Sequence, residues 1–472
     1  MTRSALAWLA FVVTCLSAAR ATAAPSLDPG TWRGDVRFLR AAIDSLHPRP
    51  YRAHSRAEWD SAGSDLERRL PSLRYYEAVA AFSAFVGLLG DGHSRLDQLR
   101  LVAHAWPTLG PLPGPGFGTR YPIRCAVFAD GLWITEAGTS YKQLASTKVV
   151  AIAGRPTADA IAALARLIPA DNPMWTLHVV PEYLRSPGYM SAAGLAKSPE
   201  APLQLTVARA SGERSEVGVA PGTPDSAALW VRELGETSPL NRRLNMLGFS
   251  MAFADLGDSA RTVFARIRAI VDEPGHETVA AFAARLFAHV DSIGCRRLIL
   301  DLRGNGGGDN YLNQPIVHAV LRRPAIDRSG GLFVIIDRGT FSAAVSLAAD
   351  LERETHARFA GEPTGGAPDS PGDPASVTLP ASGLVVRIST TMWNGSDPRD
   401  PRRCIFPDLP AMPTWARYIT GRDVALDAIT AWHASPGERD VPPNQHWGDP
   451  RQLHGELPGI AWPPLGSSAG PR

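Results

Sequence analysis

Two short apolar runs, Leu298–Leu302 and Leu332–Ile336, are each followed by a turn of small and polar residues. Both runs are rich in branched aliphatic residues and bounded by glycine, which is typical of buried β-strands. The stretch between them, Tyr311–Arg323, has helical character. A strand–helix–strand unit crosses over in the right-handed sense, so its two strands are parallel and their carboxyl ends lie at one edge of the sheet. We therefore expect the two turns to be neighbours.

The turn after the second run carries a serine, Ser342, directly before a predicted helix that begins at Ala343. At such a strand-to-helix corner, free backbone N–H groups and the positive end of the helix dipole can expose a serine and stabilise an oxyanion beside it. Two other interpretations stay open. Ser342 can be an ordinary helix N-cap beside a tight glycine turn. The glycine turn can also hold a dinucleotide, although Asp309 stands where the full G-x-G-x-x-G pattern needs glycine.

A histidine, His93, follows a predicted helix that ends at Gly90. Helical spacing relates the apolar positions of that helix, which are Tyr75, Val79, Phe82, Val86 and Leu89. A glycine stop of this kind holds the next side chains at a defined place. Taken alone, His93 is better explained as a surface-loop histidine or as part of a capped helix end than as a catalytic residue.

Several motifs in this order resemble the tail-specific, or C-terminal-processing, serine peptidase family. The strand motif of that family is matched by Asp301–Gly308, which reads D-L-R-G-N-G-G-G. The other matches are Leu89–Ser94, Gly361–Gly366, Pro407-Asp408 and Gly421–Ile429. The resemblance spans roughly residues 35–432 and implies an α/β catalytic domain of the tail-specific protease type.

The chain departs from the best-known branch of this family, which uses a Ser-Lys pair. Its only lysines are Lys142, Lys148 and Lys197, and none follows the predicted nucleophile. A serine hydroxyl needs an adjacent base, and histidine titrates near neutral pH. The tricorn-protease branch is similar, since it pairs a serine with an upstream histidine. The resemblance therefore implies Ser342 as nucleophile and His93 as general base.

The resemblance leaves the remaining site residues less defined. The related branch orients its histidine with a glutamate shortly before the P-D element, but this chain has no glutamate there. Asp400 is nearest to the expected place, and Asp397 and Asp91 are alternatives. For the oxyanion hole, the resemblance implies the backbone N–H groups of Gly307 and Ala343.

The N-terminus predicts export to the periplasm or the outside of the cell. Residues 1–23 combine Arg3, an apolar stretch and an Ala-Thr-Ala cleavage site, typical of a signal peptide, with an uncleaved anchor as the alternative. The formal charge of +2 falls to about zero without Arg3 and Arg20, which gives no support to nucleic-acid binding. No later run is long and apolar enough to span a membrane. Cys125, Cys295 and Cys404 would remain, so one disulfide is possible.

The rest of the chain predicts an α/β protein of several domains. We expect an N-terminal helical region at 24–105, a β-rich module at 119–220, the catalytic domain at 247–433 and a Pro/Gly-rich tail at 434–472. In the module, Leu132–Thr135 and Val149–Ile152 predict strands, and the second run continues into a turn that resembles the PDZ-like domains of the family. Such a module can capture an extended peptide or act as a spacer. In the catalytic domain, Val263–Ile270 and Val279–Val290 predict helices, and Asp423–Trp432 closes it.

Together these features predict an exported serine peptidase that uses no cofactor or metal and acts on peptides or proteins. No zinc, P-loop or G-x-S-x-G pattern is present. Two alternatives stay open: a non-catalytic carrier of a retinoid or fatty acid on the same scaffold, and an esterase or amidase for small substrates. The oligomeric state is not predicted.

Overall fold

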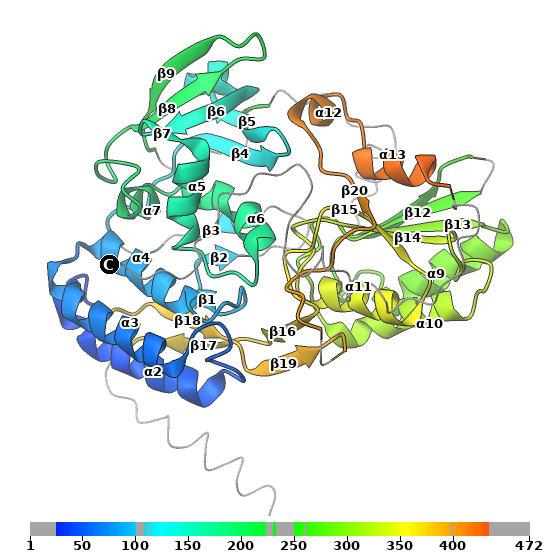
Figure 1. Ribbon diagram of the computed structural model, residues 1–472, viewed down its shortest axis with the longest axis horizontal. Helices are drawn as coiled ribbons and strands as arrows, with labels where there is room; N and C mark the ends of the chain where they lie inside the picture. Colours follow the sequence, from blue (N-terminus) through cyan, green and yellow to red (C-terminus); the bar gives the residue numbers. More distant parts are fainter. Residues whose placement is uncertain are drawn as a thin grey trace, which may run out of the picture.

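The computed structural model describes residues 25–100, 108–110, 112, 114–222, 230–232, 250–258, 261–397 and 400–433 (Figure 1). The predicted signal peptide and the Pro/Gly-rich tail lie outside these ranges. One part of the molecule, at the left of Figure 1, holds the N-terminal helices and a twisted antiparallel sheet. The other part, at the right, is a sheet flanked by helices.

The right-hand part is built on a six-stranded sheet. The strand order is β11-β12-β13-β14-β15-β20; only β11 is antiparallel to its neighbour. The strands are β11 (Met251–Asp255), β12 (Thr262–Ile267), β13 (Arg297–Asp301), β14 (Leu332–Ile336), β15 (Arg358–Gly361) and β20 (Leu409–Pro410). The predicted parallel strand–helix–strand unit is therefore confirmed, with the carboxyl ends of β13 and β14 side by side.

Helices cover both faces of this sheet, because successive apolar side chains of its strands point to opposite faces and both faces must be buried. On one face, Leu298 and Leu300 of β13 pack in a cluster with α9, α10 and α11; on the other, Ile299 packs with α13. These helices are α9 (Val279–Ser292), α10 (Gln314–Leu321), α11 (Ala343–Glu354) and α13 (Val424–Ala431). Burying each such side chain is worth about 1.5–3 kcal/mol, so the strand ends are held on a rigid base.

One predicted element of this part is wrong. The helix predicted at Val263–Ile270 is instead strand β12, and every residue from Thr262 to Ile267 is buried. A short apolar run buried on both sides has no periodicity that separates a strand from a helix, and here valine, phenylalanine and isoleucine favour the strand. The helix predicted at Val279–Val290 is confirmed as α9.

The left-hand part joins three helices to a hairpin from much later in the chain. The helices are α2 (Arg33–Leu46), α3 (Arg56–Arg69) and α4 (Tyr75–Gly87). Just after α4, β1 (Arg95–Leu96) pairs antiparallel with β18 (Val385–Ile388), which forms a hairpin with β17 (Ala375–Thr378). The segment that follows His93 is thus paired with a hairpin that comes after Ser342 in the chain.

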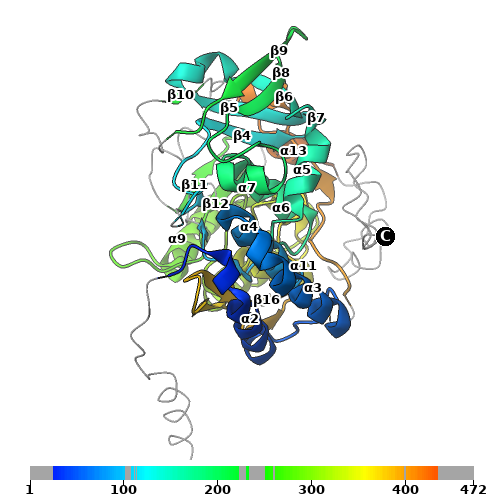
Figure 2. The same cartoon turned by 90° about the vertical axis from the view of Figure 1, so that its left-hand side faces the viewer.

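A second sheet stands above these helices (Figure 2). Its strands are β4 (Ile123–Phe128), β5 (Gly131–Gly138), β6 (Thr147–Ile152), β7 (Arg155–Pro156), β8 (Leu203–Ala208), β9 (Arg214–Val219) and β10 (Trp230–Arg232). The strands predicted at Leu132–Thr135 and Val149–Ile152 are confirmed within β5 and β6. Between β7 and β8 the chain forms α5 (Thr157–Ala165), α6 (Pro173–Leu184) and α7 (Pro187–Ala192).

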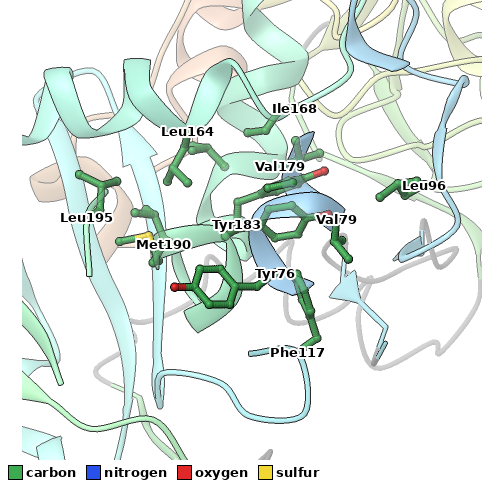
Figure 3. Close-up of a cluster of buried hydrophobic side chains, with 14 of the residues drawn as sticks. Tyr76, Val79, Leu96, Phe117, Leu164, Ile168, Val179, Tyr183, Met190 and Leu195 are labelled. Carbon is green, nitrogen blue, oxygen red and sulfur yellow. The ribbon is translucent and has the colours of Figure 1, made fainter. Parts of the chain in front are cut away.

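One hydrophobic cluster runs through the whole left-hand part. Figure 3 shows Tyr76 and Val79 of α4 beside Val179 and Tyr183 of α6. The same cluster reaches the second sheet and includes Phe341, from the turn that carries the predicted nucleophile. The α6 region therefore packs against both candidate catalytic elements.

The other described elements are short: β2 (Leu99–Arg100), β3 (Thr108–Leu109), β16 (Asp369–Gly372), β19 (Thr391–Asn394), α12 (Trp415–Ile419), and 3₁₀ turns at Pro29–Thr31, Leu70–Ser72, Thr139–Leu144 and Asn310–Asn313. Within the described ranges, no helix is both long enough and apolar enough to cross a membrane. The three cysteines in those ranges are free and buried, so the possible disulfide does not form among them.

Candidate active site

Ser342 lies in a strained corner between β14 and α11. Its backbone has φ 54° and ψ −129°, a conformation that costs a non-glycine residue about 1–3 kcal/mol. Ser342 occupies the N-cap position, but its side chain makes no capping hydrogen bond. The ordinary N-cap interpretation is therefore not supported, and the hydroxyl is left for another role.

Hydrogen bonds between the two turns hold the corner in this shape. The Thr340 hydroxyl donates to the Leu302 carbonyl at 3.0 Å, and the Phe341 N–H donates to the Asn305 carbonyl at 3.0 Å. Asp337 accepts from the N–H groups of Gly304 and Gly339, each at 2.9 Å. Burial, and then the charge of Glu362, raise the pKa of Asp337 to about 6.

The glycine turn approaches Ser342 very closely. A Cβ atom on Gly307, where φ is 104°, would lie 2.5 Å from the Ser342 Cβ, so only glycine fits there. The Gly307 N–H, predicted as an oxyanion donor, has a different partner in the structure: it donates to Asn305 Oδ1 at 2.9 Å. Gly306 and Gly308 line the pocket in front of Ser342. Ala343, the other predicted donor, is the first residue of α11, where a helix leaves its N–H without an intrahelical acceptor.

His93 lies in a buried loop between α4 and β1. Its N–H donates to Asp91 Oδ1 at 2.8 Å, which fixes the backbone, and its ring stacks on Phe341 with 4.4 Å between centroids. Phe341 stacks in turn on Trp175 of α6 at 4.0 Å. Because Phe341 directly precedes Ser342, this stack fixes the imidazole relative to the strained corner.

Asp91 is a fully buried acceptor in the same loop. Its carboxylate accepts from the hydroxyls of Ser94 and Ser389, each at 2.6 Å, and from the Ser94 N–H at 3.2 Å. His47 Nε2 lies 3.3 Å from it and His93 Nδ1 lies 3.6 Å from it. Although burial opposes ionisation, His47, His93 and Ser389 hold the pKa of Asp91 well below its usual range. Asp91, one of the two alternatives to Asp400, is therefore an ionised carboxylate beside the imidazole.

Asp400 lies in a different network. Its carboxylate binds the Arg402 side chain at 2.8–3.1 Å, and Arg402 also binds Glu352 at 2.7 Å. Neither ring nitrogen of His93 has a hydrogen-bond partner among the described residues. The structure thus does not bring Asp400 to His93, because the buried Arg402 guanidinium takes its oxygens.

A second buried acid near His93, Asp171, was not singled out by the sequence. It precedes α6 and accepts from the Gly92 N–H at 3.0 Å. Burial, and then the charge of Asp91, raise its pKa to about 6. One ligand atom each from Asp91, His93 and Asp171 lies within 4.8 Å of the other two, a spacing that could also hold a metal ion. A metal would have to compete with the groups that already donate to Asp91.

Ser342 and His93 line one pocket of about 660 Å³ between the two parts of the molecule. The right-hand part contributes Phe341, Ser342 and the glycine turn, and the left-hand part contributes the loop after α4. The pocket is further lined by Arg95, Asp97, Asp373, Pro374 and Arg387. A serine at a helix N-terminus, an imidazole beside an ionised carboxylate and a pocket open to both form an arrangement that can carry out acyl transfer.

Comparisons with known proteins find this arrangement of elements in solved structures. The structure of mature CPAF complexed with lactacystin matches with a TM-score of 0.56 at 13% identity, over 86% of this chain and 98% of that chain. The crystal structure of mature CPAF matches with a TM-score of 0.55 at 14% identity, over 86% of this chain and 96% of that chain. No family model and no curated protein matches the chain. Over most of its length, this chain is similar in fold to mature CPAF.

Proposed function

We propose that this protein is a serine-type peptidase of the tail-specific kind, with Ser342 as nucleophile and His93 as general base. The observation that carries the proposal is the strained Ser342, uncapped at the start of α11, in the pocket that His93 also lines. The ordered motifs from Leu89 to Ile429 and the fold shared with mature CPAF support it.

In this mechanism, His93 takes the proton of Ser342 as the hydroxyl attacks the carbonyl carbon of a peptide bond. His93 then gives the proton to the leaving amine and later activates the water that releases the acyl group. Asp91 replaces Asp400 as the acid that stabilises the imidazolium, because its carboxylate is ionised and lies beside Nδ1. Asp171 adds a second carboxyl group within 4.8 Å of the ligand atoms of Asp91 and His93.

The oxyanion of the tetrahedral intermediate would form at the start of α11. The Ala343 N–H and the helix dipole favour negative charge at this point. The Gly307 N–H already donates to Asn305. We therefore propose that a backbone N–H of Gly306 or Gly308, both of which line the pocket, supplies the second donor.

A fluorophosphonate probe tests the nucleophile directly. We expect it to label Ser342 in the purified protein and to leave Ser342→Ala unlabelled, with hydrolysis of a peptide library falling at least about 1,000-fold in that variant. Ser346→Ala, one turn further along α11, is the matched control and should label normally. Failure of the wild-type protein to label or to cleave any peptide would overturn the proposal.

The same assay separates the two alternative functions. A retinoid or fatty-acid carrier would bind a fluorescent fatty acid without labelling at Ser342. A small-substrate esterase or amidase would label and cleave p-nitrophenyl esters but no peptide. For the peptidase, kcat/KM should fall on acidification, because a protonated imidazole cannot act as the base.

Export and peptide capture are further parts of this proposal. Cleavage near Ala24 would release the mature protein, which N-terminal sequencing of the secreted or periplasmic form would test. The β4–β9 sheet with α5 would bind an extended peptide by strand addition, which binding of a labelled peptide to that region would test.

A further inference from the structure

Two arginines from neighbouring strands line the pocket in front of Ser342. Arg95 of β1 and Arg387 of β18 stand directly opposite each other in the antiparallel pair. Both belong to the lining of the pocket that holds Ser342 and His93. Like charges opposite each other on a β-ladder are destabilising, so folding alone does not favour this pair.

Arg95, which lines the pocket, is held in place by hydrogen bonds to the backbone. It is buried, and its Nη1 donates to the carbonyls of Gly92 at 2.9 Å and His93 at 3.1 Å. Burial, and then the charge of Arg387, lower the pKa of Arg95 to about 10, which still leaves it cationic at neutral pH. The guanidinium is thus positioned by the same backbone that positions the general base.

Arg387 is only weakly neutralised by its surroundings. Its Nε is buried without a hydrogen-bond partner in the part of the chain that the structure describes. Its nearest acid is Asp97, with 3.9 Å between Nη1 and Oδ1, which exceeds hydrogen-bond distance. That carboxylate is exposed, as is Asp373 on the pocket rim, so solvent screens both acids.

A carboxylate is the ligand that fits such a pair. A guanidinium offers two parallel N–H donors to the two oxygens of a carboxylate, and a group between Arg95 and Arg387 would relieve their repulsion. Placed in this pocket, the carboxylate would lie close to the bond that Ser342 attacks.

We infer that Arg95 and Arg387 form a subsite for a substrate carboxylate next to the scissile bond. This inference rests on the proposed peptidase function and narrows its substrate class to peptides that carry an acidic side chain or a free C-terminal carboxylate near the cleavage site. A carboxylate bound there has a negative charge and two equivalent acceptor oxygens, so it binds the guanidinium groups more strongly than a neutral amide does.

The test compares paired peptide libraries on wild-type protein and on Arg387→Gln. In the first set, the two peptides of each pair differ only by Glu or Gln at one position near the cleavage site. In the second set, they differ only by a free or an amidated C-terminus. We expect wild-type kcat/KM to favour one carboxylate-bearing set by about 10- to 100-fold, and Arg387→Gln to remove that preference. Arg37→Gln, at an exposed ion pair on α2, is the matched control and should retain the preference.

A binding measurement keeps the test independent of catalysis. In the Ser342→Ala background, fluorescein-labelled Glu peptides should bind more tightly than their Gln counterparts, and Arg387→Gln should abolish the difference. Asp97→Asn should enlarge it, because it removes the competing acid. Equal binding and cleavage of the Glu, Gln, free-acid and amide sets would overturn the subsite even if Ser342 labels. Absence of labelling with a surviving Glu preference in binding would instead overturn only the peptidase function.

Discussion

The corner that carries Ser342 and the loop that carries His93 are held by different kinds of interaction. The corner is fixed by short-range hydrogen bonds between two turns that follow adjacent strands of one sheet, made by backbone groups, the Thr340 hydroxyl and the Asp337 carboxylate. The His93 loop is fixed by a buried carboxylate, Asp91, whose donors include Ser389, almost 300 residues later in the chain. The position of Ser342 therefore depends on local geometry and stores strain, whereas the position of His93 depends on long-range polar contacts.

The largest expected effect concerns Asp91. Asp91→Asn removes the ionised acceptor beside His93 and turns an amide N–H₂ toward several donors. We expect kcat to fall about 1,000- to 10,000-fold, as for loss of the acid of a catalytic triad, and the free energy of unfolding to fall by about 3 kcal/mol. Steady-state kinetics and urea unfolding measure the two effects. A variant with wild-type kcat would show that the base does not use this carboxylate.

The matched comparison is Asp400→Asn. This change weakens the buried network with Arg402 and Glu352, so we expect the free energy of unfolding to fall by about 3 kcal/mol. The folded fraction should keep its kcat, because the network does not reach His93. Urea unfolding and titration of labelled sites with the fluorophosphonate probe give both values. A large loss of kcat per folded site would instead indicate that Asp400 takes part in catalysis.

Both regions contain a buried aspartate whose pKa is raised to about 6, Asp171 beside His93 and Asp337 in the Ser342 corner. Each folded-state pKa exceeds the ordinary value of 3.8, so each group favours folding below that value and loses this contribution as pH rises through about 6. Asp171→Asn should therefore gain stability relative to the wild-type protein between about pH 4 and about pH 7. Denaturant unfolding across that range measures the gain, and a constant difference would contradict it.

The smallest expected effect concerns the strain at Ser342. Glycine adopts a positive φ without steric cost but loses more backbone entropy on folding. We expect Ser342→Gly to raise the free energy of unfolding by about 1 kcal/mol, compared with Ser342→Ala, which keeps the Cβ. Thermal and urea unfolding of the two Ser342 variants measures the contribution of the backbone conformation to the free energy of unfolding. A glycine variant less stable than the alanine variant would mean that the corner is not strained.

The sequence predicts the two regions to different extents. Strands β13 and β14, helix α11 and the Ser342 corner follow from apolar runs and glycine positions that are close in the chain. The helix prediction for Val263–Ile270 is wrong because a run buried on both faces has the same apolar character in a strand as in a helix. The βαβ geometry is local enough to be derived before any coordinates are known.

The acids around His93 could not be assigned in this way. Asp400 is nearest to the place where the related branch has its glutamate, but the guanidinium of Arg402, two positions away, binds its oxygens. Asp171 stands before Asn172-Pro173 and would be taken for part of a helix start, since nothing in the sequence shows that it is buried against Gly92. The hydrogen bond from the Gly307 N–H to Asn305 Oδ1 is likewise a contact within a turn that no sequence pattern indicates.

The pairing of β1 with β18 has a consequence for when activity can arise. A growing chain that has been synthesised only as far as Pro380 already contains His93 and Ser342, but it lacks β18 and the hydroxyl that Ser389 gives to Asp91. Until that late segment is made, the His93 loop lacks both its paired strand and one of the hydrogen bonds to Asp91. Under the proposed function, peptide hydrolysis should therefore begin only after most of the polypeptide has been made.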